Sequence, residues 1–144
     1  MVSATLLHVG LHKTASTSLQ ATCGLNRDLL ESNGYNYPAL FNSHGGVKTE
    51  NHSIALFNIF SSSRLSYHQN AGKSRSLIES DVSVYRRLLL LALLKKNTLI
   101  LSGEDVSDLS VNEQEKLATY IGAFSGTVKT LAVVRSPYSL HCSA

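Results

Sequence analysis

The fold of this chain is decided by ATLLHVGLHKTASTSLQ, residues 4–20. Residues 4–9 form an apolar run typical of a buried strand, and from about Ala15 the spacing of apolar residues predicts a helix that continues to Asn33. Lys13 and a cluster of serine and threonine hydroxyls stand where the strand passes into the helix. A lysine and several hydroxyls at such a junction indicate a binding function as well as a fold.

The rest of the chain alternates helices and apolar strands. Gly34 is expected to end the first helix in a left-handed conformation, and Ser110 with Glu113 forms an S-x-x-E capping box that predicts another helix start. The leucine-rich helix 80–96 is apolar on nearly every side, which predicts full burial. Two further strands are predicted, TLILS at 98–102 and VKTLAVV at 128–134. Continuous apolar strands separated by helices predict an α/β fold, with one parallel sheet and helices on both faces.

Composition argues against several classes of function. The 144 residues carry a net charge of only +3 on scattered lysines and arginines, so general nucleic-acid binding has little support. The start of the chain does not resemble a signal peptide, and the longest apolar run, LLLLALL at 88–94, is too short to span a bilayer. Cys23 and Cys142 lack disulfide or metal spacing, so we expect two reduced thiols in a cytoplasmic protein without a membrane segment. No feature of the sequence predicts the oligomeric state.

The strand-to-helix junction has the properties of an anion-binding loop. Ligands of parallel α/β sheets bind outside the carboxyl ends of the strands, and the first amides of a helix have no helical partner. Ser16 and Thr17 add hydroxyl donors, and Lys13 adds a full charge. An ATP-type Walker loop is disfavoured, because it needs glycine directly before the lysine and His12 stands there. The alternative is that the hydroxyls only cap a helix and the lysine is solvated.

The stretch HVGLHKTASTSLQ resembles the 5′-phosphosulfate loop of the sulfotransferases that use 3′-phosphoadenosine 5′-phosphosulfate (PAPS), where a K-[ST]-[GA]-[ST]-[ST] core follows the first strand. The resemblance implies that Lys13 contacts the bridging oxygen of the phosphosulfate and assists its departure. It also implies that Thr14, Ser16 and Thr17 hold the 5′-phosphate. Ala15 replaces a frequent glycine, a mild departure if its backbone is right-handed helical. The nucleotide-binding residues expected from this loop, 10–18, are His12, Lys13, Thr14, Ala15, Ser16, Thr17 and Ser18.

A second motif of the same family follows the third predicted strand. Members of the family place an arginine there and, eight positions later, a serine, and the two bind the 3′-phosphate; Arg135 and Ser143 have this spacing. An arginine fork binds phosphate oxygens in pairs, and Pro137 suits the first position of a new helix. Taken alone, 135–143 fits an ordinary strand-to-helix turn better. Together with the loop 10–18, it predicts a 3′-phosphate site.

Sulfuryl transfer needs a base for the acceptor hydroxyl. His52 is a candidate because ENHSIAL, after GYNYP, resembles a histidine segment of these relatives; if Asn51 caps a helix, the helix dipole keeps the ring neutral. Glu104 lies in LILSGEDVSDLS, which resembles a Ser and Glu stretch of bacterial-type relatives and would border the acceptor site. An acidic residue in the first turn of a short helix is an equally good reading of Glu104. His44 is a further rival for the role of base.

The resemblance implies a P-loop NTPase-like sulfotransferase fold, of which residues 1–144 form the N-terminal part, so we expect an apparently truncated domain. The expected reaction transfers a sulfuryl group from PAPS, as cosubstrate, to an unidentified acceptor hydroxyl or amine. No His/Cys cluster has metal spacing, so no metal ion is expected. Two alternatives stay open. One is a non-catalytic nucleotide-binding or interaction fragment, and the other is a P-loop kinase relative, which the missing Gly–Lys pair and Walker B carboxylate disfavour.

Overall fold

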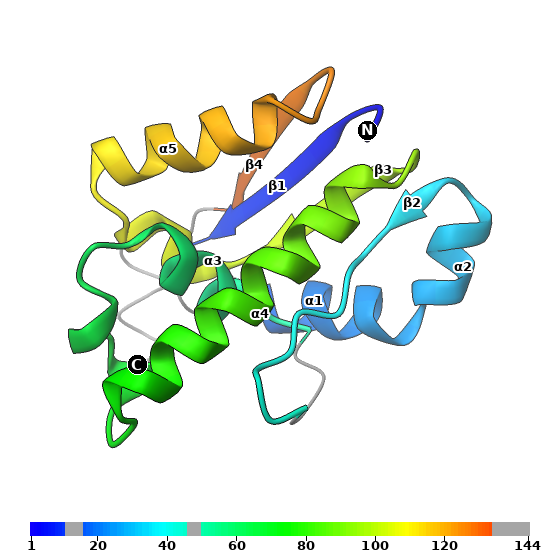
Figure 1. The fold of residues 1–144 in the computed structure, drawn as a ribbon. Helices are drawn as coiled ribbons and strands as arrows, with labels where there is room; N and C mark the ends of the chain where they lie inside the picture. Colours follow the sequence, from blue (N-terminus) through cyan, green and yellow to red (C-terminus); the bar gives the residue numbers. More distant parts are fainter. Residues whose placement is uncertain (11–15, 46–49, 134–144) are drawn as a thin grey trace, which may run out of the picture.

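A computed structural model describes residues 1–10, 16–45 and 50–133, and it places four strands in one parallel sheet. The strands are β1 (Thr5–Gly10), β2 (Tyr35–Asn36), β3 (Thr98–Ser102) and β4 (Val128–Val133). The strand order is β2-β3-β1-β4, so β1 lies between β3 and β4, the two further strands that the sequence predicted (Figure 1). The predicted α/β fold with a parallel sheet is confirmed, and the finer P-loop NTPase-like assignment stays a prediction.

Helices form where the sequence pattern predicted them, but their bounds differ from the predicted ones. The predicted helix 15–33 is divided at Asn26, whose amide still bonds to the Thr22 carbonyl, and Gly34 ends it at a φ of +82°, as expected. The helices are α1 (Ser16–Leu25), α2 (Arg27–Ser32), α3 (Ser53–Phe60), α4 (Arg75–Leu94) and α5 (Val111–Gly122). Three short 3₁₀ turns are η1 (Arg64–Ser66), η2 (His68–Asn70) and η3 (Glu104–Asp108). None of the helices in the described part of the chain has the length and apolarity that a membrane span requires.

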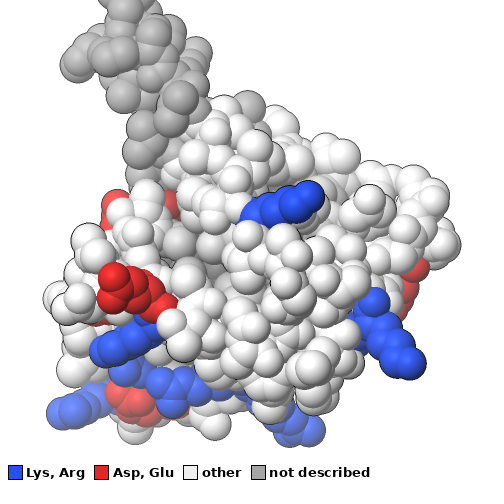
Figure 2. All heavy atoms as spheres, turned by 90° about the horizontal axis from the view of Figure 1, so that it is seen from above, with Lys and Arg blue, Asp and Glu red and all other residues white. Residues whose placement is uncertain are grey.

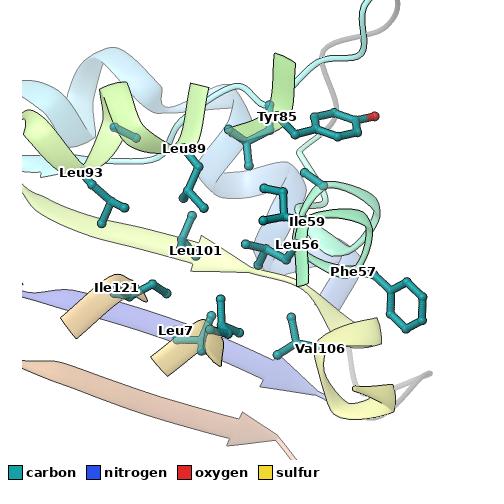
Figure 3. Packing of buried hydrophobic residues seen from close by; sticks show 14 of the residues in the cluster. Leu7, Leu56, Phe57, Ile59, Tyr85, Leu89, Leu93, Leu101, Val106 and Ile121 are labelled. Carbon is teal, nitrogen blue, oxygen red and sulfur yellow. The ribbon is translucent and has the colours of Figure 1, made fainter. Parts of the chain in front are cut away.

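One hydrophobic core lies between the sheet and the helices α3, α4 and α5. Leu7 and Leu101 are paired in register on neighbouring strands, and both point into this core. Leu89 and Leu93 of α4 point toward Leu101, and Ile121 of α5 lies near Leu7 (Figure 3). Since successive residues of a strand alternate between faces, the next pair, His8 and Ser102, points to the opposite face.

The leucine run of α4 is not buried on all sides, so that prediction is wrong. Leu89 and Leu93 are fully buried, whereas Leu91 and Leu94 are about half exposed, at 52% and 50%. A helix of 3.6 residues per turn that packs on one sheet turns only one side toward it, whatever the composition of its other side. A run of leucines therefore does not show that the helix is covered on both sides.

The two faces of the sheet are covered unequally in the described structure. The strand β4 is exposed along nearly its whole length, and Leu131 keeps 57% of its surface accessible. The expectation of helices on both faces therefore holds near β1 and β3, where α1 contributes Gln20, and fails at β4. On the side seen in Figure 2, charged groups of both signs gather mainly along the rim, and no broad basic surface forms.

The predicted capping box at the start of α5 is present, and it also holds the loop after α3. Glu113 Oε2 accepts a hydrogen bond from the Ser110 amide at 3.0 Å. Its Oε1 accepts from the amide and the hydroxyl of Ser62, at 2.6 and 2.7 Å. These donors lower the pKa of the Glu113 carboxyl to about 2, because they stabilise its charged form.

Replacing Glu113 by glutamine is expected to lower the free energy of unfolding by about 1–2 kcal/mol at pH 7. The NH2 group of glutamine would take the place of one carboxylate oxygen, and it cannot accept the hydrogen bonds that this oxygen receives. The lowered pKa stabilises the fold above pH 4.5, and this contribution is lost as the pH falls from 4.5 through 2. The difference between the two proteins should therefore shrink in acid. Urea unfolding at pH 7 and pH 3 measures it, with Glu115→Gln on the same helix as the control. An equal effect of both substitutions would contradict the assignment.

Candidate functional site

The chain passes from the carboxyl end of the central strand β1 to the start of α1. The strand ends at Gly10, and α1 begins at Ser16 with a buried side chain, followed by exposed Thr17 and Ser18. The amides of this first turn have no carbonyl partner within the helix, so they and the hydroxyls suit an oxyanion. The other predicted nucleotide-binding residues lie outside the described residues; they are His12, Lys13, Thr14, Ala15, Arg135 and Ser143.

The end of β3 is joined closely to the start of α3 at the same edge of the sheet. The His52 amide donates to the Ser102 carbonyl at 2.8 Å, and the Asp105 amide donates to Ser53 Oγ at 3.2 Å. A Cβ atom on Gly103 would lie 3.0 Å from the Ser53 amide nitrogen, so this close approach favours glycine. The segments 51–53 and 102–105, both singled out from the sequence, thus form one structural unit.

His52 is fully buried, and both of its ring nitrogens are engaged. Nδ1 accepts from the Ser102 amide at 3.0 Å, so Nε2 carries the proton and donates to the Pro38 carbonyl at 2.9 Å. Burial lowers the pKa of His52 to about 4, which keeps the ring neutral. Asn51 Oδ1 bonds to the Ser53 amide at the start of α3, close to the predicted capping. Both ring nitrogens are used within the fold, which argues against the predicted role of His52 as base and for a structural one.

Glu104 is the remaining described candidate at this edge. It is the first residue of η3, immediately beyond β3, and it is partly exposed. The Gly103 amide before it donates to the His8 carbonyl at 3.0 Å, and the charge of Glu104 opposes the lowering of the pKa of the His8 ring. His44 is exposed in a different turn, which Asp81 of α4 holds by accepting two bonds from Ser43.

A buried polar cluster on the α1 side of the sheet was not singled out from the sequence. His8 Nδ1 lies 2.8 Å from Ser102 Oγ, and Gln20 Nε2 of α1 donates to the same hydroxyl at 3.2 Å. The alternation along β1 and β3 was the available signal, because it puts His8 and Ser102 on the face opposite Leu7 and Leu101. Three elements therefore meet at one serine hydroxyl, one turn along α1 from Ser16.

The donors at this edge suit an anionic ligand better than a cation. Hydroxyls and helix amides dominate, the described carboxylates of this edge are Glu104 and Asp105, and Asp105 already accepts a hydrogen bond from the Tyr67 hydroxyl. Within the described ranges, no group of three or more histidine, cysteine, aspartate or glutamate side chains is placed to hold a metal ion. Comparisons with family models, with curated proteins and with solved structures found no match for this chain. A functional assignment therefore depends on the residues themselves.

Proposed function

We propose that this chain binds PAPS at the carboxyl end of β1 and transfers its sulfuryl group to an acceptor hydroxyl or amine. The observation that carries the proposal is the position of the stretch 10–18 between the central strand of a parallel sheet and the start of α1. In the strand order, β2 and β3 lie on one side of β1, and β4 lies on the other. Ligands of parallel α/β sheets bind at the position where the direction of the strand order changes in this way. Ser16 at the first turn of α1 supports a role for this stretch in phosphate binding.

The pairing of β1 with β4 supports a site with two phosphate-binding segments. Gly10 and Val133 are paired in register, so the segments that follow them leave neighbouring strands at the same edge. Lys13 follows Gly10 by three residues in the sequence, and Arg135 follows Val133 by two. The proposed nucleotide site therefore draws its two cationic residues from the segments that follow β1 and β4.

The proposed reaction is an in-line displacement at sulfur. The acceptor oxygen or nitrogen forms a bond to sulfur while the bond from sulfur to the bridging phosphate oxygen breaks, which releases 3′-phosphoadenosine 5′-phosphate. Lys13 stabilises the charge that develops on that oxygen, and Ser16, Thr17 and the helix amides hold the 5′-phosphate. Glu104 takes the acceptor proton, since it lies at the sheet edge and His52 has no free ring nitrogen.

A second candidate function is nucleotide binding without transfer. It is favoured by one observation, the engagement of both nitrogens of His52, which leaves Glu104 and the exposed His44 as the described candidates for a base. Binding of 3′-phosphoadenosine 5′-phosphate without turnover of PAPS, in the presence of varied hydroxyl and amine acceptors, would favour this second candidate.

Arg135→Ala is expected to weaken binding of 3′-phosphoadenosine 5′-phosphate by about ten- to a hundred-fold, because a charge-assisted hydrogen bond contributes roughly 1.5–3 kcal/mol. Adenosine 5′-phosphate lacks the 3′ group, so its affinity should hardly change. Ser143→Ala should have a smaller effect in the same direction. Titration calorimetry of the three proteins with the two ligands measures the selectivity.

ATP with and without magnesium is the control ligand for the kinase alternative. Preference for magnesium ATP over 3′-phosphoadenosine 5′-phosphate would overturn the proposal. Equal weakening of both adenosine ligands by Arg135→Ala would mean that Arg135 supports the fold instead of the 3′-phosphate. No binding of either ligand to the folded wild-type protein would contradict the proposed function itself.

A further inference from the structure

A buried histidine with one unused nitrogen lies next to the proposed nucleotide loop. His8 stands two residues before Gly10 in β1, and only 3% of its surface is accessible. Its Nδ1 is 2.8 Å from Ser102 Oγ, while its buried Nε2 has no hydrogen-bond partner among the described residues. The reaction proposed above makes no use of this group.

His8 is connected to the start of α1 through two hydrogen bonds. Ser102 Oγ receives Gln20 Nε2 at 3.2 Å on one side and contacts His8 on the other. Ser16 and Gln20 lie one turn apart, and both are buried, at 2% and 4% exposure, so they share the inner side of α1. The orientation of the first turn of α1 therefore depends on the cluster that contains His8.

The cluster can accept a proton without losing its hydrogen bonds. When the ring is protonated, Nδ1 donates to one lone pair of Ser102 Oγ, and Gln20 donates to the other. The ring then presents Nε2 as a charged donor. Among the groups around His8 in the described part of the chain, Glu104 of η3 is charged and acts on the ring, Ser102 and Gln20 are neutral, and His52 beyond Ser102 is held neutral by burial.

Without a ligand, burial favours the neutral ring, and it lowers the pKa of His8 although Glu104 opposes the change. An oxyanion at the first turn of α1 would add negative charge to the helix that is connected to the His8 ring through Gln20 and Ser102. Opposite charges within a partly dry protein interior attract strongly, so the bound anion favours the protonated form.

We propose that His8 is a proton-linked positioning residue of the nucleotide site, so that oxyanion binding at the first turn of α1 takes up a proton and strengthens as the pH falls. This inference rests on the proposed function. Linkage requires the effect to be reciprocal, since a ligand that favours the protonated ring must bind more tightly when the ring is protonated.

Sulfate is the probe, because it does not titrate between pH 5 and 8, whereas the second ionisation of a phosphate ester lies near pH 6. Titrations at pH 5.5 and pH 8 should show sulfate binding several-fold more tightly at pH 5.5, with about tenfold as the upper limit for a change of one pKa unit in the ring. The histidine NMR signals should show the titration of His8 moving upward when sulfate is added. Competition by 3′-phosphoadenosine 5′-phosphate confirms that the sulfate occupies the nucleotide site.

Two variants distinguish the effect of proton uptake by His8 from its effect on the position of the first turn of α1. His8→Asn keeps an amide near the place of Nδ1 but takes up no proton, so it should bind sulfate like the wild type at pH 8 and lose the pH dependence. Ser102→Ala breaks both hydrogen bonds, so it should bind sulfate more weakly at both pH values. Circular dichroism shows whether each variant is folded. His68→Gln is the matched control, because His68 is an exposed histidine of η2 outside this cluster and the pH dependence should survive its removal.

The outcomes distinguish this inference from the proposed function. Sulfate binding that is equal at both pH values, or that keeps its pH dependence in His8→Asn, overturns the inference and leaves the nucleotide site intact. Unchanged sulfate binding in a folded Ser102→Ala protein contradicts the positioning link. If neither sulfate nor 3′-phosphoadenosine 5′-phosphate binds the folded wild type at either pH, the proposed function fails and the inference fails with it.

Discussion

Replacing Lys13 by alanine is expected to lower the rate of sulfuryl transfer by at least about 100-fold, since removal of one group that stabilises transition-state charge typically costs 10²- to 10³-fold. Lys13 is the full positive charge of the loop 10–18, and the departing phosphate oxygen gains negative charge as its bond to sulfur breaks. The interaction is strongest in the transition state, so the rate should fall more than the affinity for PAPS. Release of 3′-phosphoadenosine 5′-phosphate from PAPS, with a panel of acceptor hydroxyls and amines, measures the rate.

Lys96→Ala is the matched control for Lys13→Ala. Lys96 is exposed and precedes β3, at the opposite end of the sheet from the loop, so its loss should leave both transfer and nucleotide affinity unchanged. Normal turnover in Lys13→Ala would remove the lysine from the mechanism. An equal loss in both variants would point to the overall charge of the protein instead of a placed group.

His52→Ala is expected to destabilise the fold by about 3 kcal/mol at pH 7, because it leaves two buried hydrogen-bonding groups without partners and opens a cavity. These groups are the Ser102 amide and the Pro38 carbonyl, which the ring connects. In a domain of this size, the expected fall in melting temperature is about 6–12 °C. His52→Asn should lose about half as much, since its amide oxygen still reaches the Ser102 amide. The exposed His44 gives the control, His44→Ala, with no expected change.

The pH dependence of stability gives a second test of the same assignment. The pKa of His52 is about 4 in the fold, below its ordinary value of 6.5, so the unfolded chain binds a proton between these values and the fold does not. Stability contributed by the neutral ring is therefore complete above pH 6.5 and is lost as the pH falls from 6.5 to 4. His8 shifts in the same direction, so part of this acid sensitivity should remain in His52→Asn.

Unfolding curves at pH 7 and pH 5 distinguish a structural histidine from a catalytic one. A His52→Ala protein with unchanged stability and a selective loss of transfer would restore the base role that the sequence predicted. A destabilised protein that still turns over PAPS below its melting temperature would confirm the structural role and leave proton transfer to Glu104 or His44.

The sequence alone was sufficient wherever the physical cause is local. The strand at 98–102 and the capping box at Ser110 and Glu113 were predicted correctly, and the strand predicted at 128–134 is present over Val128–Val133, where the described residues end. Gly34 was expected in a left-handed conformation and adopts it. Apolar runs, capping residues and glycine act on their near neighbours in the chain, so their effect is readable without knowledge of the fold.

Tertiary structure decided the features that depend on what lies across the sheet. Composition alone could not show that Leu91 and Leu94 face outward, because burial depends on the single layer that α4 covers. Nor could it show that β1 lies between β3 and β4, since strand order is set by how helices pack on the two faces.

In the candidate site, too, some features could be predicted from the sequence and others depend on the tertiary structure. The residue types of the loop 10–18 and of 135–143 indicate anion binding from the sequence, and their role stays a prediction. The chain pattern made His52 look like a base, because a histidine at a helix start is suited to accept a proton. Only the packing of α3 against the end of β3 showed that Ser102 and Pro38 occupy both of its nitrogens. Proton transfer requires a free lone pair facing the substrate, and that depends on neighbours far apart in the sequence and close together in the fold.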